Sequence, residues 1–358
     1  MMRKIQLCAG LALLLLVFTA MGGLHRSTAQ TTPALRAAVS IQPMAGIVRE
    51  VGGAQTAITV LLPEGVEPHA FSLTPAVIEA ANAADLLVLT GHFTWEEDLV
   101  LQTGKPYITL DDYEALGAEL LPLHGSTHSL QRSQTWTLRH YTEHDENLHG
   151  YWLLPSNAVA IANATRILCS SLSPAHTEYW QARFDEFVSE VAELEAFIDE
   201  QSAIYNLAGN PVVITFPAEA YVAAALGLDV RGLLTEGGNI FISGNELVAL
   251  EQELHSGAIH LIIASDVARL QTAGEFAQQL STDSGVPLVW LRIIFSTIQD
   301  YIGIMTYNIG VITTGLSSGA AALDFYAIGL PIILMAAIIS VIAIIECVLL
   351  VRYTRTRE

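Results

Sequence analysis

Two histidines stand in sequence surroundings from which an imidazole could reach a cleft. His69 comes after an apolar, strand-like stretch and a turn that contains Gly65, and His149 comes just before Tyr151. A neutral imidazole binds borderline cations such as zinc through one nitrogen, while an acceptor usually holds the other nitrogen and fixes the tautomer. The two residues are therefore candidate zinc ligands, although a histidine considered by its type alone is more often an ordinary surface residue.

Further histidines lie near these two in the chain. His92 follows a strand-like stretch that ends at Thr90; it could face the same cleft, but we interpret it as a residue at the start of a helix. Others are spread over a polar, acidic stretch, which is typical of a solvated loop. The members of that stretch are His124, His128, His140 and His144, with Glu143, Asp145 and Glu146 among them.

Short apolar stretches that alternate with helical patterns indicate which elements hold these residues. Such alternation is typical of an α/β domain with a largely parallel sheet. It occurs twice in the chain, so we predict two similar lobes with mainly parallel sheets. The expected strands are Ala37–Ile41, Ile58–Leu62, Leu86–Thr90 and Ile108–Leu110 in the first lobe, and Val212–Thr215, Gly232–Leu234, Leu261–Ala264 and Leu288–Trp290 in the second.

A long helical pattern from Ser173 to Ser202 lies between the two sets of strands. Its apolar residues recur at a spacing that keeps one stripe facing inward, which predicts a single helix joining the lobes. We expect an amino-terminal metal-binding lobe over residues 35–155, a linking helical region over 156–205 and a carboxy-terminal lobe over 206–320. The stripe consists of Phe184, Phe187, Val188, Val191, Leu194 and Ile198.

Both ends of the chain predict contact with a membrane. Basic residues at positions 3 and 4 precede an apolar stretch and a zone of small residues, the layout of a signal peptide over residues 1–30. Residues 327–351 carry a single charge and precede arginines, as a transmembrane anchor with a cytoplasmic flank does. We predict a single-pass protein of the cell membrane with an extracellular two-lobed domain and a cytoplasmic tail; an uncleaved signal segment would add a second pass.

The composition excludes some classes of partner and site. The 36 acidic and 16 basic residues give a formal charge of −20. A surface this acidic disfavours nucleic acid and anionic membranes as partners, and it is compatible with a cation as ligand or with solubility alone. Of the three cysteines, only Cys169 lies between the apolar ends, so neither a disulfide framework nor a thiolate metal site is available there.

Several segments carry a resemblance to a known family. Residues Leu61–Pro75, which include His69, resemble the first metal-ligand motif of the zinc/manganese substrate-binding proteins of ABC transporters, the TroA-like group also called cluster A-I. Residues Leu148–Pro155, which include His149, and Asp300–Asn308 resemble later segments of the same family in the same order. The long joining helix is also similar to the family's connecting helix.

The resemblance implies a function and a ligand set. It implies the extracytoplasmic substrate-binding component of an ABC importer, which binds Zn2+ between its lobes, or Mn2+ as the second choice, and delivers the ion to a membrane permease driven by an ATPase. His69 and His149 would be ligands from the first lobe. The histidine-containing acidic stretch would either gather metal weakly or remain an ordinary solvated loop.

The second lobe departs from the family pattern at two ligand positions. The resemblance implies a His or Glu where this chain has Phe216, and an acidic residue where it has Arg292, whose guanidinium is always cationic. Glu219, in the first turn after Pro217, is the nearest carboxylate and is our predicted third ligand, although it also suits the helix dipole there. Asp266 is a further carboxylate that could instead cap the following helix.

These departures keep other functions open. A membrane-anchored surface receptor or sensor of the same fold could bind an altered ligand, such as a metal chelate or an anion, which a guanidinium would favour. A zinc hydrolase is a different class, but the chain has no His-Glu-x-x-His motif, and no Gly-x-Ser-x-Gly sequence follows a predicted strand. We therefore predict a receptor and not an enzyme.

Overall fold

The computed structural model describes residues 32–123, 146–237, 240–242 and 244–318. The predicted signal segment (1–30) and the predicted transmembrane segment (327–351) lie outside the described residues. So do six residues of the acidic stretch, namely His124, His128, His140, Glu143, His144 and Asp145. Within the described ranges, no helix is both long enough and apolar enough to cross a membrane.

The first lobe is built on a four-stranded parallel sheet with the strand order β2-β1-β3-β4. Strand β1 lies inside this sheet, and its last three residues are completely or almost completely buried, as expected for a strand covered on both faces. The strands are β1 (Leu35–Val39), β2 (Thr56–Val60), β3 (Leu86–Val88) and β4 (Tyr107–Ile108); the helices are α2 (Gln42–Gly52), α3 (Pro75–Ala83), α4 (Thr94–Thr103) and α5 (Leu110–Ala115).

The second lobe repeats this plan with a parallel sheet of order β10-β9-β5-β6 and a short antiparallel pair, β7 and β8. The strands are β5 (Pro211–Ile214), β6 (Asp229–Leu233), β7 (Thr235–Gly237), β8 (Ile240–Phe241), β9 (Leu261–Ser265) and β10 (Leu288–Leu291). The helices are α8 (Glu219–Ala225), α9 (Gly244–Ser256), α10 (Thr272–Ser284) and α11 (Tyr301–Ser318). The prediction of two parallel-sheet lobes is confirmed.

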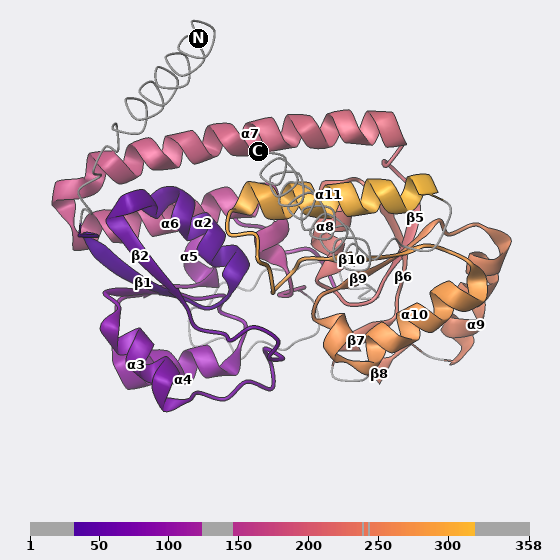
Figure 1. Cartoon of the computed structure of the whole chain (residues 1–358), viewed down its shortest axis with the longest axis horizontal. Helices are drawn as coiled ribbons and strands as arrows, with labels where there is room; N and C mark the ends of the chain where they lie inside the picture. Colours follow the sequence, from indigo (N-terminus) through magenta and orange to yellow (C-terminus); the bar gives the residue numbers. More distant parts are fainter. Residues whose placement is uncertain (1–31, 124–145, 238–239, 243, 319–358) are drawn as a thin grey trace, which may run out of the picture.

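Two helices join the lobes. Helix α6 (Pro155–Leu172) leads into α7 (Thr177–Tyr205), whose 29 residues give a rod of about 43 Å. Figure 1 shows α7 running along one side of the molecule above both lobes. The predicted stripe is buried at Phe187, Val191, Leu194 and Ile198, but Val188 is 37% exposed.

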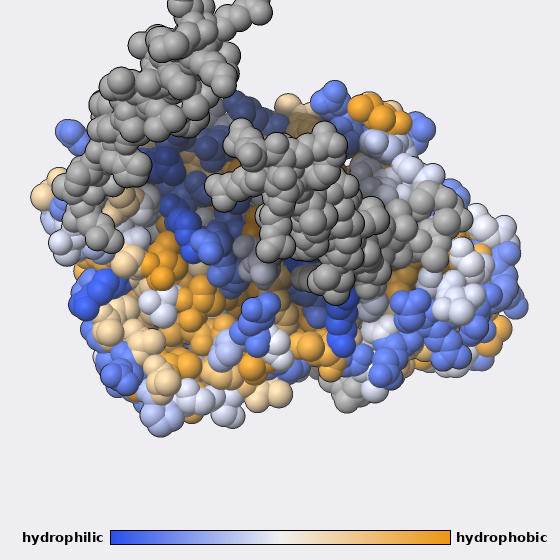
Figure 2. All heavy atoms as spheres, viewed as in Figure 1, coloured by the Kyte–Doolittle hydropathy of each residue, from blue (hydrophilic) through white to orange (hydrophobic). Residues whose placement is uncertain are grey.

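The apolar core is continuous between the lobes. One cluster of buried residues extends from the first sheet through α6, α7 and α11 to one face of the second sheet, where it includes Val212 and Ile214. The intervening Val213 belongs to a second cluster, packed under α9 and α10 on the other face. This alternation follows from the two-residue period of a strand. On the face shown in Figure 2, apolar side chains gather over the first lobe.

Candidate metal centre

His69 lies in the segment between β2 and α3, and the residues on both sides of it form hydrogen bonds that hold the backbone. The indole Nε1 of Trp95 donates a hydrogen bond to the carbonyl of Pro68 at 3.2 Å. The amide of Ala70 donates to the carboxylate of Glu67 at 2.6 Å. The imidazole itself is exposed. The backbone on both sides therefore fixes this side chain at the surface end of the site.

His92 lies between β3 and α4, directly after Gly91, which has a φ of +71°. The turn is held by Glu96, whose carboxylate is buried in the first turn of α4. This carboxylate accepts hydrogen bonds from the amides of Thr90 at 2.9 Å, His92 at 3.2 Å and Phe93 at 3.3 Å. His92 thus extends from the carboxyl end of a parallel strand, where α/β proteins place their ligands.

His149 lies on a segment that the second lobe holds. The side-chain amide of Asn147 donates to the carbonyl of Pro217 at 2.8 Å, and its Oδ1 accepts from the amide of His149 at 3.0 Å. The hydroxyl of Tyr221, in α8, donates to the carbonyl of Asn147. The chain then turns at Gly150, whose φ is +82°. The position of His149 therefore depends on contacts with the loop before α8.

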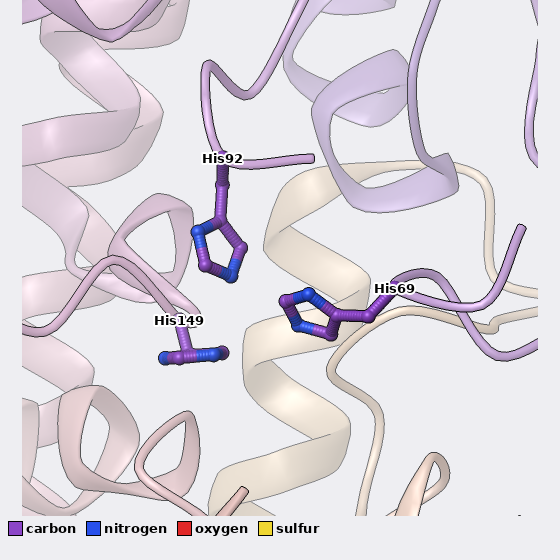
Figure 3. Close-up of side chains that lie close together, drawn as sticks. All are labelled: His69, His92 and His149. Atoms are coloured by element: carbon purple, nitrogen blue, oxygen red, sulfur yellow. The ribbon is translucent and has the colours of Figure 1, made fainter. Parts of the chain in front are cut away.

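The structure brings the three imidazoles together (Figure 3). The ring centroids are 4.7 Å apart for His69 and His92, 5.4 Å for His69 and His149, and 4.3 Å for His92 and His149. One ring nitrogen of each lies within 4.8 Å of the others. Nitrogens bound to one tetrahedral zinc are about 3.4 Å apart, so small ring rotations suffice to bind an ion.

Buried nitrogens in this group have no hydrogen-bond partner among the described residues. These are both ring nitrogens of His92 and the Nδ1 of His149. A buried polar atom left unpaired costs about 1–3 kcal/mol, so native structures rarely retain one without a reason. Because a neutral imidazole has one lone-pair nitrogen and one N–H, His92 and His149 could each offer one lone pair to a cation bound here. The donor set of neutral imidazoles suits zinc.

Burial also sets the charge of the group. It lowers the pKa of His149 to about 3, with a further lowering by His69, and it lowers the pKa of His92 well below its usual value, with His149 and His69 adding to the effect. Both imidazoles are therefore neutral at physiological pH. Neutral imidazole is the form that binds a metal.

Of the predicted ligands, His69 and His149 lie in this group, and Glu219 does not. The Glu219 carboxyl is fully buried at the start of α8, where its Oε2 accepts from the amide of Phe216 at 2.5 Å. Its Oε1 has no partner among the described residues, and burial raises the pKa of this carboxyl to about 8. His92 takes the third place in the group, and it also lies two residues before the first residue of α4.

The two altered positions of the second lobe have other contacts. The amide and carbonyl of Arg292 pair with the side chain of Asn308 at 2.8 and 3.0 Å, and its guanidinium carbon lies 5.5 Å from the centre of the Tyr307 ring. Phe216 packs against the second core cluster.

Asp266 has a structural role in the second lobe. Its carboxylate accepts from the amides of Val267 at 2.9 Å and Phe295 at 2.8 Å, so it joins the segments after β9 and β10. Burial raises the pKa of this carboxyl to about 6. It is absent from the histidine group, and the described part of the chain adds no carboxylate to that group.

Comparisons with known proteins agree with this geometry. Residues 38–315 match the family described as "Zinc-uptake complex component A periplasmic". A relative, the manganese-binding lipoprotein MntA of Halalkalibacterium halodurans, is 22% identical over 331 residues, which are 88% of this chain and 100% of the relative. The prediction of a resemblance to zinc/manganese solute-binding proteins is confirmed.

Solved structures show the same fold. The SBP FpvC from Pseudomonas aeruginosa in complex with Mn2+ is similar with a TM-score of 0.61 and 20% identity, covering 80% of this chain and 99% of that chain. The AdcAII protein of Streptococcus pneumoniae is similar with a TM-score of 0.62 and 19% identity, covering 80% of this chain and 100% of that chain.

The comparisons correct the predicted location. The relative MntA is a lipoprotein, which contradicts the prediction of a single-pass membrane protein with an extracellular domain and a cytoplasmic tail. We therefore withdraw the predicted attachment through a carboxy-terminal helix.

Proposed function

This chain belongs to the family of periplasmic zinc-uptake components, and from that premise we propose that it binds zinc as the cargo of an ABC importer and delivers it to the permease. The family consists of metal-binding receptors that work with a permease and an ATPase, and its members are not enzymes. The observation that carries the proposal is the group formed by His69, His92 and His149, with its unpaired buried nitrogens.

The donor set favours zinc over manganese. Imidazole nitrogen suits zinc, copper, iron and nickel, whereas manganese prefers carboxylate, carbonyl and water oxygens. The histidine group contains three imidazoles and no carboxylate from the described residues. We propose a tetrahedral zinc with His69, His92 and His149 as ligands and water or one further group in the fourth position.

Glu219 is our proposal for that further group. Its Oε1 is buried and has no partner among the described residues, although it lies outside the histidine group. A carboxyl with a pKa raised to about 8 is mostly protonated at pH 7, so binding the ion requires the loss of this proton. Zinc binding through Glu219 would therefore release a proton into a neutral buffer.

A titration of the metal-free full-length chain with zinc and with manganese tests the proposal. We expect one tight zinc site, weaker manganese binding, and a loss of zinc affinity of more than about 100-fold in His69→Ala, His92→Ala or His149→Ala, because even a lost supporting contact to a ligand costs 10–100-fold. The control is His255→Ala, an exposed histidine of α9. Zinc affinity that survives all three substitutions would refute the site.

Glu219→Gln tests the fourth ligand in the same titration. If Glu219 is a ligand, the variant should bind zinc more weakly and should no longer release a proton on binding. Proton release is measured by titration calorimetry in buffers of different ionisation enthalpy, and without it the heat of zinc binding is the same in all of them. Unchanged affinity and unchanged buffer dependence would leave the fourth position to water.

A hydrolytic function has no support in the fold. A Gly-x-Ser-x-Gly sequence does occur at residues 315–319, but Ser317 lies within helix α11 and donates its hydroxyl to the carbonyl of Thr313. The nucleophile elbow of a hydrolase is instead a sharp turn between a strand and a helix. Ser317 therefore lies within a helix and not at a nucleophile elbow.

A further inference from the structure

We propose that Glu96 is a positioning residue for metal binding, because it fixes the backbone that carries His92. The inference rests on the proposed function of the histidine group. Glu96 is 2% exposed, so its carboxylate is held entirely by protein groups. It does not belong to the histidine group itself and acts through the residues around it.

The carboxylate accepts hydrogen bonds from two separate segments, the end of β1 and the connection between β3 and α4. Oε1 accepts from the hydroxyl of Ser40, at the end of β1, and from the amide of Thr90 at 2.9 Å, after β3. Oε2 accepts from the amide of His92 at 3.2 Å and from that of Phe93 at 3.3 Å. Hydrogen bonds to a charged acceptor contribute about 1.5–3 kcal/mol each, so this set defines the path of the His92 turn.

The same anchor extends to His149. The carbonyl of Thr90, whose amide and hydroxyl both donate to Glu96, accepts a hydrogen bond at 2.8 Å from the hydroxyl of Tyr151. Tyr151 lies two residues after His149. The carboxylate therefore fixes the His92 turn directly. Through Thr90, which also contacts Tyr151, it fixes the distance between that turn and the segment that carries His149.

This role goes beyond the capping of a helix. Glu96 is the third residue of α4, and its bond to the amide of Phe93 is an ordinary capping contact. The bonds to Thr90 and His92 reach past the helix start, into the segment that presents the imidazole. A cap alone contributes to the stability of α4, whereas these contacts also determine where the His92 nitrogen lies.

Glu96→Gln in the full-length chain tests the proposal. The variant keeps the shape of the side chain but turns an NH2 group toward N–H and O–H donors. We expect zinc affinity, measured in competition with a chromophoric chelator, to fall by about 10–100-fold, the usual effect of losing a contact that orients a ligand. The matched control is Glu97→Gln, one residue along the same turn and exposed, which should bind as the wild type does.

Combination with His92→Ala separates positioning from general stability. If Glu96 acts mainly through the His92 turn, Glu96→Gln weakens zinc binding clearly less once His92 is absent than in the wild-type background, because only the contact of Thr90 with Tyr151 then remains. The same loss in both backgrounds would mean that the substitution acts on the fold, and would overturn the proposal.

Hydrogen exchange of the metal-free protein provides a readout that does not depend on zinc. We expect the amides of His92 and Phe93 to exchange faster in Glu96→Gln than in Glu97→Gln, with no change in the core of α7. Equal exchange in the two variants would overturn the positioning role. If the wild type binds no zinc while Glu96→Gln still shows the faster exchange, the proposed function is refuted, and only the role of Glu96 in fixing the His92 turn remains.

Discussion

At the residue scale, the histidine group contains two imidazoles that their surroundings keep in the neutral form, His92 and His149, because burial lowers the pKa of both. His149 and His92 are half-buried beside each other and beside His69, and they have ring nitrogens shielded from water, so protonation of either would place a charge in a poorly solvated position near other imidazoles. A proton is the natural competitor of a metal ion for a histidine nitrogen. The low pKa values therefore keep these two ligands available in mildly acidic surroundings.

The same pKa values predict that the metal-free protein loses stability in acid. The pKa of His149 is about 3 in the folded state and about 6.5 in the unfolded state, so the unfolded chain binds more protons between these values. Stability must then fall as the pH decreases through 6.5, by about 2 kcal/mol from His149 alone at pH 5. Urea unfolding at pH 7 and pH 5, in the presence of a chelator, measures the loss.

His149→Gln should show a smaller loss between the two pH values, because it has no imidazole to protonate. His255→Gln, an exposed control, should lose as much as the wild type. Equal losses in all three proteins would contradict the low pKa of His149.

The sequence predicted part of this centre. His69 and His149 were predicted as ligands because the segments around them resemble ligand motifs, and both lie in the histidine group, whereas the predicted Glu219 does not. His92 was not predicted, because a histidine after a strand has no local signal that distinguishes a ligand from a helix-start residue. Only the tertiary approach of three separate loops shows that it meets the other two.

At the element scale, the turns at the strand ends decide where the imidazoles lie. His92 and His149 each adjoin a glycine with positive φ, Gly91 at +71° and Gly150 at +82°. Such backbone disfavours residues with a side chain. At Gly150 space is also restricted, since a Cβ there would lie 2.7 Å from the carbonyl oxygen of Ala218.

Gly150→Ala should therefore damage the site, and Gly117→Ala provides the matched control. Both positions have positive φ, but a Cβ at Gly117 would meet no atom within 4 Å. We expect each substitution to cost about 1–2 kcal/mol through backbone strain, and Gly150→Ala to cost more because the His149 segment must move. Thermal unfolding and zinc titration measure the two effects. Equal zinc affinity of the two variants would show that the His149 segment tolerates the shift.

The positions of the strands were predictable from the sequence, but the helices that pack around them were less predictable. Each predicted strand has a counterpart in the two sheets, because apolar runs between turn residues are a strong local signal. The exposure of Val188 was not predictable, since the inward stripe of α7 is narrower than its apolar pattern and depends on how closely α6 and α11 pack. The separate helix α6 within the linking region also became visible only in the structure.

At the scale of the whole molecule, the proposed zinc site joins the lobes although its three proposed ligands come from the first half of the chain. His69 and His92 are held by contacts within the first lobe, through Trp95 and Glu96. His149 is held through Asn147 by Pro217 and Tyr221 of the second lobe. A bound ion would therefore connect two imidazoles held by the first lobe with one imidazole held by the second lobe.

Zinc should accordingly stabilise the whole molecule and not only one lobe. A ligand that binds only the folded state adds about 2.7 kcal/mol at a free concentration of 100 times its Kd. We expect one thermal transition that moves to higher temperature with zinc and returns with a chelator, and no movement in a variant that combines His69→Ala with His92→Ala. A shift confined to one of two separate transitions would show that the lobes unfold independently.

The attachment of His149 to the second lobe has a consequence for the residence time of the ion. Helix α7 and the apolar core connect the two lobes, and the ring centroids of His92 and His149 are 4.3 Å apart, so a displacement of one lobe against the other would separate these two proposed ligands. Dissociation would then be governed by how often the lobes separate. A membrane partner that displaces the loop before α8 would then promote release without touching the metal.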